Sequence, residues 1–171
     1  MIDLEEIRRN SRIHLDRQGR FHHAGEAVEH PGVHRALCQG LAIREDGEVT
    51  LQIGEQWCYL TVEEPPQFVV SVRAAEAGSP HPGAWELTLL NGDVERLDPG
   101  TLFHVGDEDL YCMTTEGRAC ARFLRDAYHR LAEHLQEAPD GEGIALVLGE
   151  RIVPIRREDE RPRHALLSAA G

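Results

Sequence analysis

Lysine is absent from the 171 residues of this chain, so all 18 basic side chains are arginine. This absence excludes a P-loop lysine, a Schiff-base lysine and a Ser-Lys catalytic pair. Positive charge is also scarce, because the formal net charge is -12. Nucleic-acid polymers and anionic membranes attract basic surfaces, so the sequence predicts neither as a partner. A small anionic ligand stays open, because a local pocket can oppose the overall charge.

Long hydrophobic runs are absent too. The N-terminus, "MIDLEEIRRN", has mixed charges and no apolar core of a signal peptide, and no apolar run approaches the roughly 20 residues that span a bilayer. We therefore predict a cytoplasmic protein without a membrane span. Four cysteines stand at irregular spacings, which predicts free thiols in a reducing compartment: Cys38, Cys58, Cys112 and Cys120.

The residues that are present predict an α+β fold. With 41% hydrophobic residues, the chain can bury a core of its own. Helical patterns at 4–9 and 31–40 are followed by short strands, and a second group of strands precedes a long helical pattern at 116–137. We expect two similar halves of antiparallel sheet plus helix, over residues 1–66 and 67–156, then a charged tail at 157–171. The strand that ends at Glu64-Pro65-Pro66 marks the join, because proline cannot donate to a sheet.

The pattern at 116–137 predicts one long amphipathic helix. At about 100° per residue, its apolar face would hold Cys120, Phe123, Leu124, Ala127, Tyr128, Leu131 and Leu135. A basic stripe of Arg118, Arg122, Arg125 and His129 falls about 160° away. We interpret this stripe as a solvated face, with a partner protein as the alternative.

The stretch "IGEQWCYLTVEEPP" at 53–66 alternates between two faces. Cys58, Leu60 and Val62 form an ordinary core face. Trp57 and Tyr59 lie on the opposite face among polar residues, in a chain with nine aromatic residues in all. Two interpretations stay open: the rings pack under neighbouring strands, or they face a ligand, a partner or the other half.

The order of several segments resembles the bacterial domain-of-unknown-function family twelve-eighty-five (DUF1285). These segments are "GRFHHAGEAVEHPGVHRAL", "GEQWCYLTVEEPPQF", "LTLLNGDVERLD", "YCMTTEGRACARFLRDAYHRLAEHL" and "EGIALVLGERIVPI", and together they span about residues 12–156. The positions that match the family pattern are His22, Gly25, Glu55, Trp57, Glu63, Pro66, Asn91, Gly92 and Asp93. Phe21 replaces the usual tryptophan, Gln56 replaces a lysine, and the "NGD" turn is one residue short.

The resemblance implies a duplicated α+β core whose second half is similar to pleckstrin-homology folds. It also implies a ligand site between the halves, for a nucleotide-like molecule, and a role in signalling. It does not imply an enzyme. The lost lysine at Gln56 argues against a strongly anionic ligand in this chain.

Four further groups of residues could carry chemistry. His30, His34 and Cys38 have the spacing of metal ligands on one helix face, but the following Pro31-Gly32 favours a capping role for His30. His14, His22 and His23 form a second, equally incomplete histidine group. Cys58 and Cys112, with a histidine such as His104, are the candidates for nucleophilic catalysis, and both thiols are predicted to be buried and inert. "GDED" at 106–109 is predicted to be a solvated turn.

Three hypotheses follow. The first is a non-catalytic ligand-binding or signalling module without cofactor or metal, whose site between the halves is floored by Trp57 and Tyr59. Its polar edge would hold His22, Glu55, Glu63, Asn91 and Asp93. The second is a protein-interaction subunit that uses the aromatic face and the basic stripe. The third is an enzyme with a Cys-His pair or a metal. The sequence indicates no oligomeric state.

Overall fold

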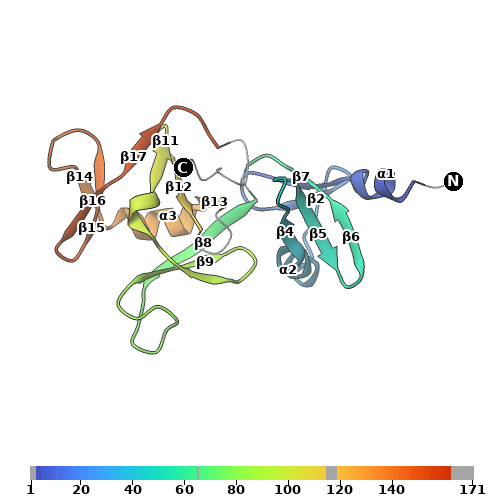
Figure 1. Ribbon diagram of the computed structural model, residues 1–171, viewed down its shortest axis with the longest axis horizontal. Helices are drawn as coiled ribbons and strands as arrows, with labels where there is room; N and C mark the ends of the chain where they lie inside the picture. The colour runs from blue at the N-terminus through green and yellow to red at the C-terminus, as the bar shows by residue number, and fades with distance from the viewer. Residues whose placement is uncertain (1–2, 65, 115–118, 163–171) are drawn as a thin grey trace.

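The computed structural model describes residues 3–64, 66–114 and 119–162, and it confirms the α+β class. Figure 1 shows two lobes side by side along the long axis of the molecule. One lobe holds the elements before residue 64, and the other holds the elements after residue 66. Among the described residues, every strand pairing joins two strands of the same lobe. The boundary of 66/67 and the likeness of the second half to pleckstrin-homology folds stay predictions.

The N-terminal half contains two short helices and two small sheets. The helices are α1 (Leu4–Arg9) and α2 (Pro31–Gly40). One sheet has the order β3-β2-β1-β7, from β1 (Ile13–Leu15), β2 (Phe21–His23), β3 (Glu26–Ala27) and β7 (Thr61–Val62). The other is the predicted meander of β4 (Leu41–Ile43), β5 (Val49–Ile53) and β6 (Gln56–Tyr59). All pairings are antiparallel except that of β1 with β7.

Helix α2 begins and ends where the sequence indicates. The His30 ring nitrogen Nδ1 accepts the backbone N–H of Gly32 at 3.1 Å, which confirms its capping role. The helix ends at Gly40, where the chain passes very close to β5. A Cβ atom at this position would lie 2.1 Å from the backbone oxygen of Gln52, so only glycine permits the approach.

The C-terminal half is built on one large sheet with the order β10-β9-β8-β13-β12-β11-β17. Its strands are β8 (Gln67–Ala74), β9 (Trp85–Leu89), β10 (Val94–Arg96), β11 (Phe103–Val105), β12 (Asp109–Met113), β13 (Cys120–Phe123) and β17 (Arg156–Glu158). A second sheet has the order β14-β15-β16, from β14 (Leu135–Glu137), β15 (Ile144–Leu148) and β16 (Arg151–Pro154). Helix α3 (Arg125–Ala132) packs on β8, and the short 3-10 helix η1 (Pro99–Thr101) precedes β11. β13–β8 and β11–β17 are parallel, so the sheet is mixed rather than purely antiparallel.

The prediction of one long helix over 116–137 is wrong. Its described part contains strand β13, the short helix α3 and strand β14 in succession, whereas 115–118 lie outside the described residues. Four of the seven predicted apolar positions are nevertheless buried, namely Cys120 and Phe123 of the strand and Ala127 and Leu131 of the helix, and the other three are half-buried. A buried strand followed directly by an amphipathic helix therefore gave a hydrophobic pattern that resembles that of a single long helix.

Each half has its own hydrophobic core. The C-terminal core centres on Val69, Leu87, Leu110, Leu131 and Leu146, with the two sheets and α3 around it. The N-terminal core holds Leu15, Phe21, Leu37, Cys38, Val49, Leu51 and Leu60. Phe68, Leu90 and Leu124 of the C-terminal half also join this second core. The two halves are thus in apolar contact, not merely tethered.

The predicted charged tail at 157–171 is in part structured. Residues 157 and 158 belong to β17, which pairs with β11, and Arg161 is tied into the junction of the halves. Residues 163–171 lie outside the described part of the chain. Among the helices that the structure describes, none has both the length and the apolar composition to cross a membrane.

Candidate binding sites at the junction of the two halves

The aromatic pair of β6 lies beneath helix α1. The rings of Trp57 and Tyr59 meet edge to face, with centroids 5.3 Å apart. The guanidinium groups of Arg8 and Arg9 each lie 4.1 Å from one ring centroid, over Trp57 and Tyr59 respectively. Stacking of this kind is a favourable cation–π contact. The aromatic face is therefore covered by the chain's own first helix.

A shallow apolar groove of about 480 Å³ runs beside Trp57, and residues 4 to 58 form all of it. Its walls include three strongly exposed apolar side chains: Leu4, Ile7 and Ile53. The expectation that Trp57 and Tyr59 face a crevice shared with the other half is therefore wrong. A ligand-binding role for the two rings stays a prediction.

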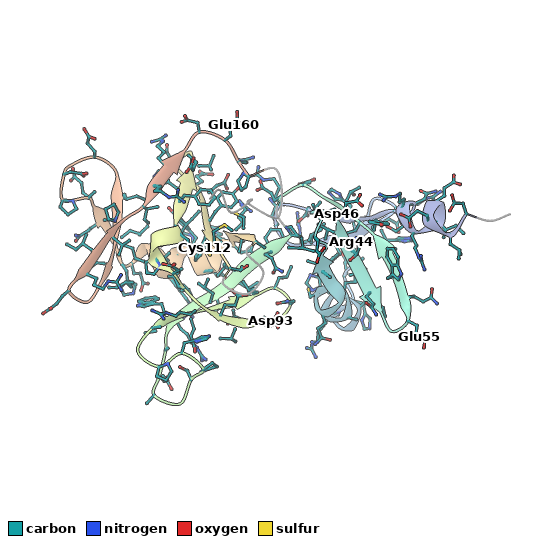
Figure 2. The ribbon with its side chains drawn as sticks, viewed as in Figure 1. Arg44, Asp46, Glu55, Asp93, Cys112 and Glu160 are labelled. Atoms are coloured by element: carbon teal, nitrogen blue, oxygen red, sulfur yellow. The ribbon has the colours of Figure 1, made fainter. Side chains whose placement is uncertain are left out.

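Glu55, Asn91 and Asp93 lie in two hairpin turns. Glu55 is exposed at the tip of the β5–β6 turn, far from Asp93 (Figure 2). Asn91 and Asp93 bond each other across the β9–β10 turn: the Asn91 amide nitrogen donates to Asp93 Oδ2 at 2.7 Å, and the Asp93 N–H donates to Asn91 Oδ1 at 3.0 Å. These bonds satisfy the turn itself. Glu55 therefore lies apart from the other two.

His22 and Glu63 each form a histidine–carboxylate pair on the β1 sheet. His22 Nε2 lies 2.9 Å from Asp16 Oδ2, and His14 Nε2 lies 3.0 Å from Glu63 Oε1. The hydrogen bond from His14 and the Arg17 amide lower the pKa of Glu63. The rings of His14 and His22 are neighbours, with centroids 6.1 Å apart. The structure thus groups His22 with Glu63 through His14.

A groove of about 590 Å³ crosses the junction between α2 and the β9–β10 turn; we call it the α2 groove. Its lining comes from both halves: Val28, Glu29, Pro31, His34, Arg35, Cys38 and Gln39 from the first, and Leu90, Asn91 and Gly92 from the second. Asn91 is the one predicted ligand-binding residue among them. Figure 2 places the neighbouring Asp93 where the C-terminal half faces the N-terminal half.

The floor of the α2 groove holds a histidine and a buried thiol. His34 packs edge-on against Phe21, with ring centroids 5.5 Å apart, and its Nδ1 lies 3.4 Å from Cys38 Sγ. Burial raises the pKa of the Cys38 thiol to about 11, so the sulfur stays protonated at neutral pH. Arg35 is exposed on the wall above. The groove thus offers donors and apolar surface, without an activated nucleophile.

A cluster of charged side chains spans the junction around Asp109, the first residue of β12; we call it the Asp109 cluster. Asp109 is 7% exposed and accepts from three arginines, which come from different parts of the chain. Arg122 Nη2 lies 2.7 Å from Oδ1, whereas Arg17 Nη2 and Arg161 Nη2 lie 3.1 Å and 2.7 Å from Oδ2. Burial alone would raise the pKa of Asp109, but the Arg122 hydrogen bond and the charges of Arg122 and Arg161 lower it.

Glu64 is the second buried carboxylate of the Asp109 cluster. Its side chain is 3% exposed, accepts the hydroxyl of the buried Tyr111 at 2.7 Å, and pairs with Arg17 Nε at 3.1 Å. Burial and the Glu64 carboxylate raise the pKa of Tyr111. The cluster is completed by a hydrogen bond from Arg122 to the backbone oxygen of Arg17. An open groove of about 650 Å³ adjoins it, lined by Arg17, Glu63, Glu64, Glu160, Arg161 and Pro162; we call it the charged groove.

Two predictions about charged surfaces are corrected here. Arg122 is not on a solvated stripe, because its side chain is 14% exposed and pairs with Asp109. The "GDED" turn is not wholly solvated either, since its last residue is Asp109. Arg118 of the stripe lies outside the described residues, while Arg125 and His129 are surface neighbours at 3.4 Å. The one sequence signal for the cluster is the isolated carboxylate pair Glu63-Glu64 at the join.

Cys58, Cys112 and Cys120 are free thiols, and Cys58 is half-buried rather than buried as predicted. Cys112 lies inside the C-terminal half (Figure 2), and burial raises the pKa of its thiol well above the usual value. Burial likewise raises the pKa of Cys120 to about 12. His104, the histidine considered for catalysis, instead pairs its Nδ1 with the backbone oxygen of Gly106 at 2.8 Å.

The fold defines a class: an α+β protein of two packed lobes whose polar groups gather where the lobes meet. Two solved structures share this fold. One is a DUF1285 family protein from Silicibacter pomeroyi DSS-3, with a TM-score of 0.59 and 18% identity over 85% of this chain and 79% of that one. The other is a DUF1285 family protein from Shewanella baltica OS155, with a TM-score of 0.52 and 16% identity over 72% of this chain and 92% of that one.

These likenesses confirm the expected resemblance to DUF1285 proteins at the level of the fold. No family model matches the sequence. No curated protein matches it either.

Proposed function

We propose that this protein is a non-catalytic binding module that holds a small, nucleotide-like ligand in the α2 groove. The observation that carries the proposal is that both halves line this groove, which has a volume of about 590 Å³. Pockets of a few hundred cubic ångströms at a junction between lobes are typical small-molecule sites. The proposal moves the predicted site from the aromatic face to the opposite end of the N-terminal core.

The chemistry of the walls suits a ligand with an apolar body and one charged group. Val28, Pro31 and Leu90 supply apolar contact area. His34 and Arg35 supply hydrogen-bond donors from α2, about one helical turn after Pro31 and on the same face. Trp57 is not among the lining residues, so aliphatic side chains take the place of the two rings that were predicted to floor the site.

The other two hypotheses lose their supporting residues. The protein-interaction hypothesis needed the aromatic face and the basic stripe as exposed surfaces, but α1 covers the rings and Arg122 lies in the Asp109 cluster. The enzyme hypothesis rested on a Cys-His pair or a metal. Burial raises the pKa of the candidate thiol Cys112, and among the described residues no group of three or more His, Cys, Asp or Glu side chains could hold a metal ion. Binding without catalysis is therefore the function that we propose.

A thermal-shift screen with nucleotides and nucleosides tests the proposal. A ligand present at about 100 times its dissociation constant stabilises the folded state by about 2.7 kcal/mol. The blocking variant is Gln39→Trp, because Gln39 is exposed and lines the groove. The matched control is Gln136→Trp on β14, where the side chain is exposed and outside the groove. A stabilising ligand whose effect is lost in Gln39→Trp and kept in Gln136→Trp supports the site. If the effect persists in both variants, the ligand binds elsewhere.

A further inference from the structure

The segment after β17 crosses from the C-terminal half to the junction. Figure 1 shows the chain leaving β17 toward the N-terminal half, and Figure 2 places Glu160 above the boundary between the lobes. One residue later, Arg161 enters the Asp109 cluster. Its Nη2 lies 2.7 Å from Asp109 Oδ2, and its Nε lies 3.8 Å from Glu64 Oε1. One guanidinium group therefore contacts a carboxylate from each half.

Contacts other than those with Arg161 orient both of these carboxylates. Glu64 is fixed by the Tyr111 hydroxyl on its Oε2 atom. Asp109 is fixed by Arg122 on its Oδ1 atom. Because both partners are themselves buried or nearly so, neither carboxylate can turn freely to solvent. Groups that are oriented in advance bind a further ion with less loss of conformational entropy.

The local charge also favours a cation at this point. Without Arg161 and the neighbouring Glu160, the charged groove is bordered by Glu63, Glu64 and the underlying Asp109 against Arg17 and Arg122. Three carboxylates against two guanidinium groups leave one excess negative charge at this point. Arg161 brings a positive charge directly to Asp109 and Glu64, while the neighbouring Glu160 adds a negative charge to the lining of the groove.

We propose that Asp109 and Glu64 form a guanidinium-binding site that Arg161 occupies, so that residues 159–162 act as a strap fastening the two halves. The planar fork of a guanidinium can meet two separate carboxylates at once, whereas an ammonium is a point charge. The site therefore selects guanidinium over a generic cation. This proposal holds whether or not the α2 groove binds a ligand.

The test uses the full chain and the variant Arg161→Ala. The matched control is Arg157→Ala on β17, just before the strap, because Arg157 is exposed and its partner Asp107 is 91% exposed. Amide hydrogen exchange is followed at residues 14–19 and 60–64, which lie across the junction from the strap. We expect exchange there to be about fivefold faster in Arg161→Ala, the loss of one partly exposed charged pair, and unchanged in Arg157→Ala.

Chemical rescue then tests the ligand class. Methylguanidinium at about 20 mM, far below the molar concentrations at which guanidinium denatures proteins, is added to Arg161→Ala. Sodium chloride at the same concentration is the control. We expect methylguanidinium to restore slow exchange and sodium chloride to have no such effect. The variant Arg161→Lys should exchange at an intermediate rate.

Three results would overturn the proposal. The first is exchange at the wild-type rate in Arg161→Ala. The second is equal rescue by the two salts, since a guanidinium site would then not exist. The third is exchange at the wild-type rate in Arg161→Lys. This result would mean that the site needs only a positive charge and does not select a guanidinium group.

Discussion

Arginine serves two regions of this protein in opposite ways. Above β6, Arg8 and Arg9 lie on aromatic rings at the surface, and Arg9 pairs with Glu48 at 2.8 Å while half of its side chain stays exposed. At the junction, Arg122 and Arg17 pair with Asp109 and Glu64, both of which are almost fully buried. The same residue type thus covers a hydrophobic surface in one place and balances buried charge in the other.

The difference matters because exposure decides what an ion pair contributes. Exposed pairs compete with water and contribute little to the free energy of unfolding. In a buried pair, removal of one partner leaves an uncompensated charge, which is strongly destabilising. We therefore expect the stability of the protein to depend on the junction and to be nearly indifferent to the arginines of α1.

The largest effect should come from Asp109→Asn. This change leaves Arg122 buried without its carboxylate, and we expect the free energy of unfolding to fall by about 3 kcal/mol or more. Urea denaturation followed by circular dichroism measures the loss. Asp107→Asn, two residues away and exposed, is the matched control and should match the wild type. Equal stability of Asp109→Asn and wild type would show that the cluster contributes no net stability.

Acid should reveal the same asymmetry. The pKa of Asp109 is lowered in the folded state, so its contribution is fully present above the unfolded value of about 3.9 and is lost as the pH falls through the lower folded value. The unfolding free energy of the wild type should therefore fall steeply below about pH 4. Asp109→Asn should show a shallower fall, and Glu48→Gln, which removes the exposed partner of Arg9, should stay close to the wild-type profile. Parallel curves for all three proteins would contradict this expectation.

A moderate effect is expected from Trp57→Ala. The half-buried ring lies between α1 and β6, and its removal exposes apolar surface and ends the contact with Arg8. We expect a loss of about 1–2 kcal/mol in the free energy of unfolding, measured by urea denaturation. Trp57→Phe should recover most of it. A loss as large as that of Asp109→Asn would mean that the two regions are equally important.

The smallest effect is expected from Arg9→Gln. Its partners Glu5 and Glu48 are both on the surface, so water replaces the lost contacts. The thermal midpoint should shift slightly at low salt and not at all in about 0.5 M sodium chloride, where exposed charges are screened. A shift that survives the salt would show that the cation–π contact with Tyr59, rather than the ion pairs, holds the helix.

The sequence predicted most of the local structure because the relevant signals are local. Pro31 and Gly40 mark the two ends of helix α2, and Asn91-Gly92 closes a hairpin. The alternation of apolar and polar residues identifies β5 and β6. The failure at 116–137 has a physical cause of the same kind. Residues 120–123 form a strand because they pair with β8 on one side and β12 on the other. The sequence of the segment itself does not indicate these partners.

The candidate sites were harder to predict because they depend on contacts between distant residues. Arg17 and Asp109 are 92 positions apart, and only the packing of the halves brings them together. The prediction placed Glu63 and Asn91 near the junction but assigned its centre to Trp57. Helix α1 lies over the two rings instead, with Arg8 and Arg9 stacked on them, and the sequence offers no periodic signal for these contacts.

The neighbouring residues Glu63 and Glu64 bond to different parts of the protein. One reaches back to His14 on β1, and the other reaches forward to Tyr111 on β12. Glu63 is bonded to the N-terminal half, and Glu64 is bonded to Tyr111 of the C-terminal half as well as to Arg17, so the length of this connector fixes how the two halves meet. Adding or deleting a single residue between Val62 and Gln67 would oblige the chain to release one of its two anchors, so this short passage should tolerate substitution far better than any change in length.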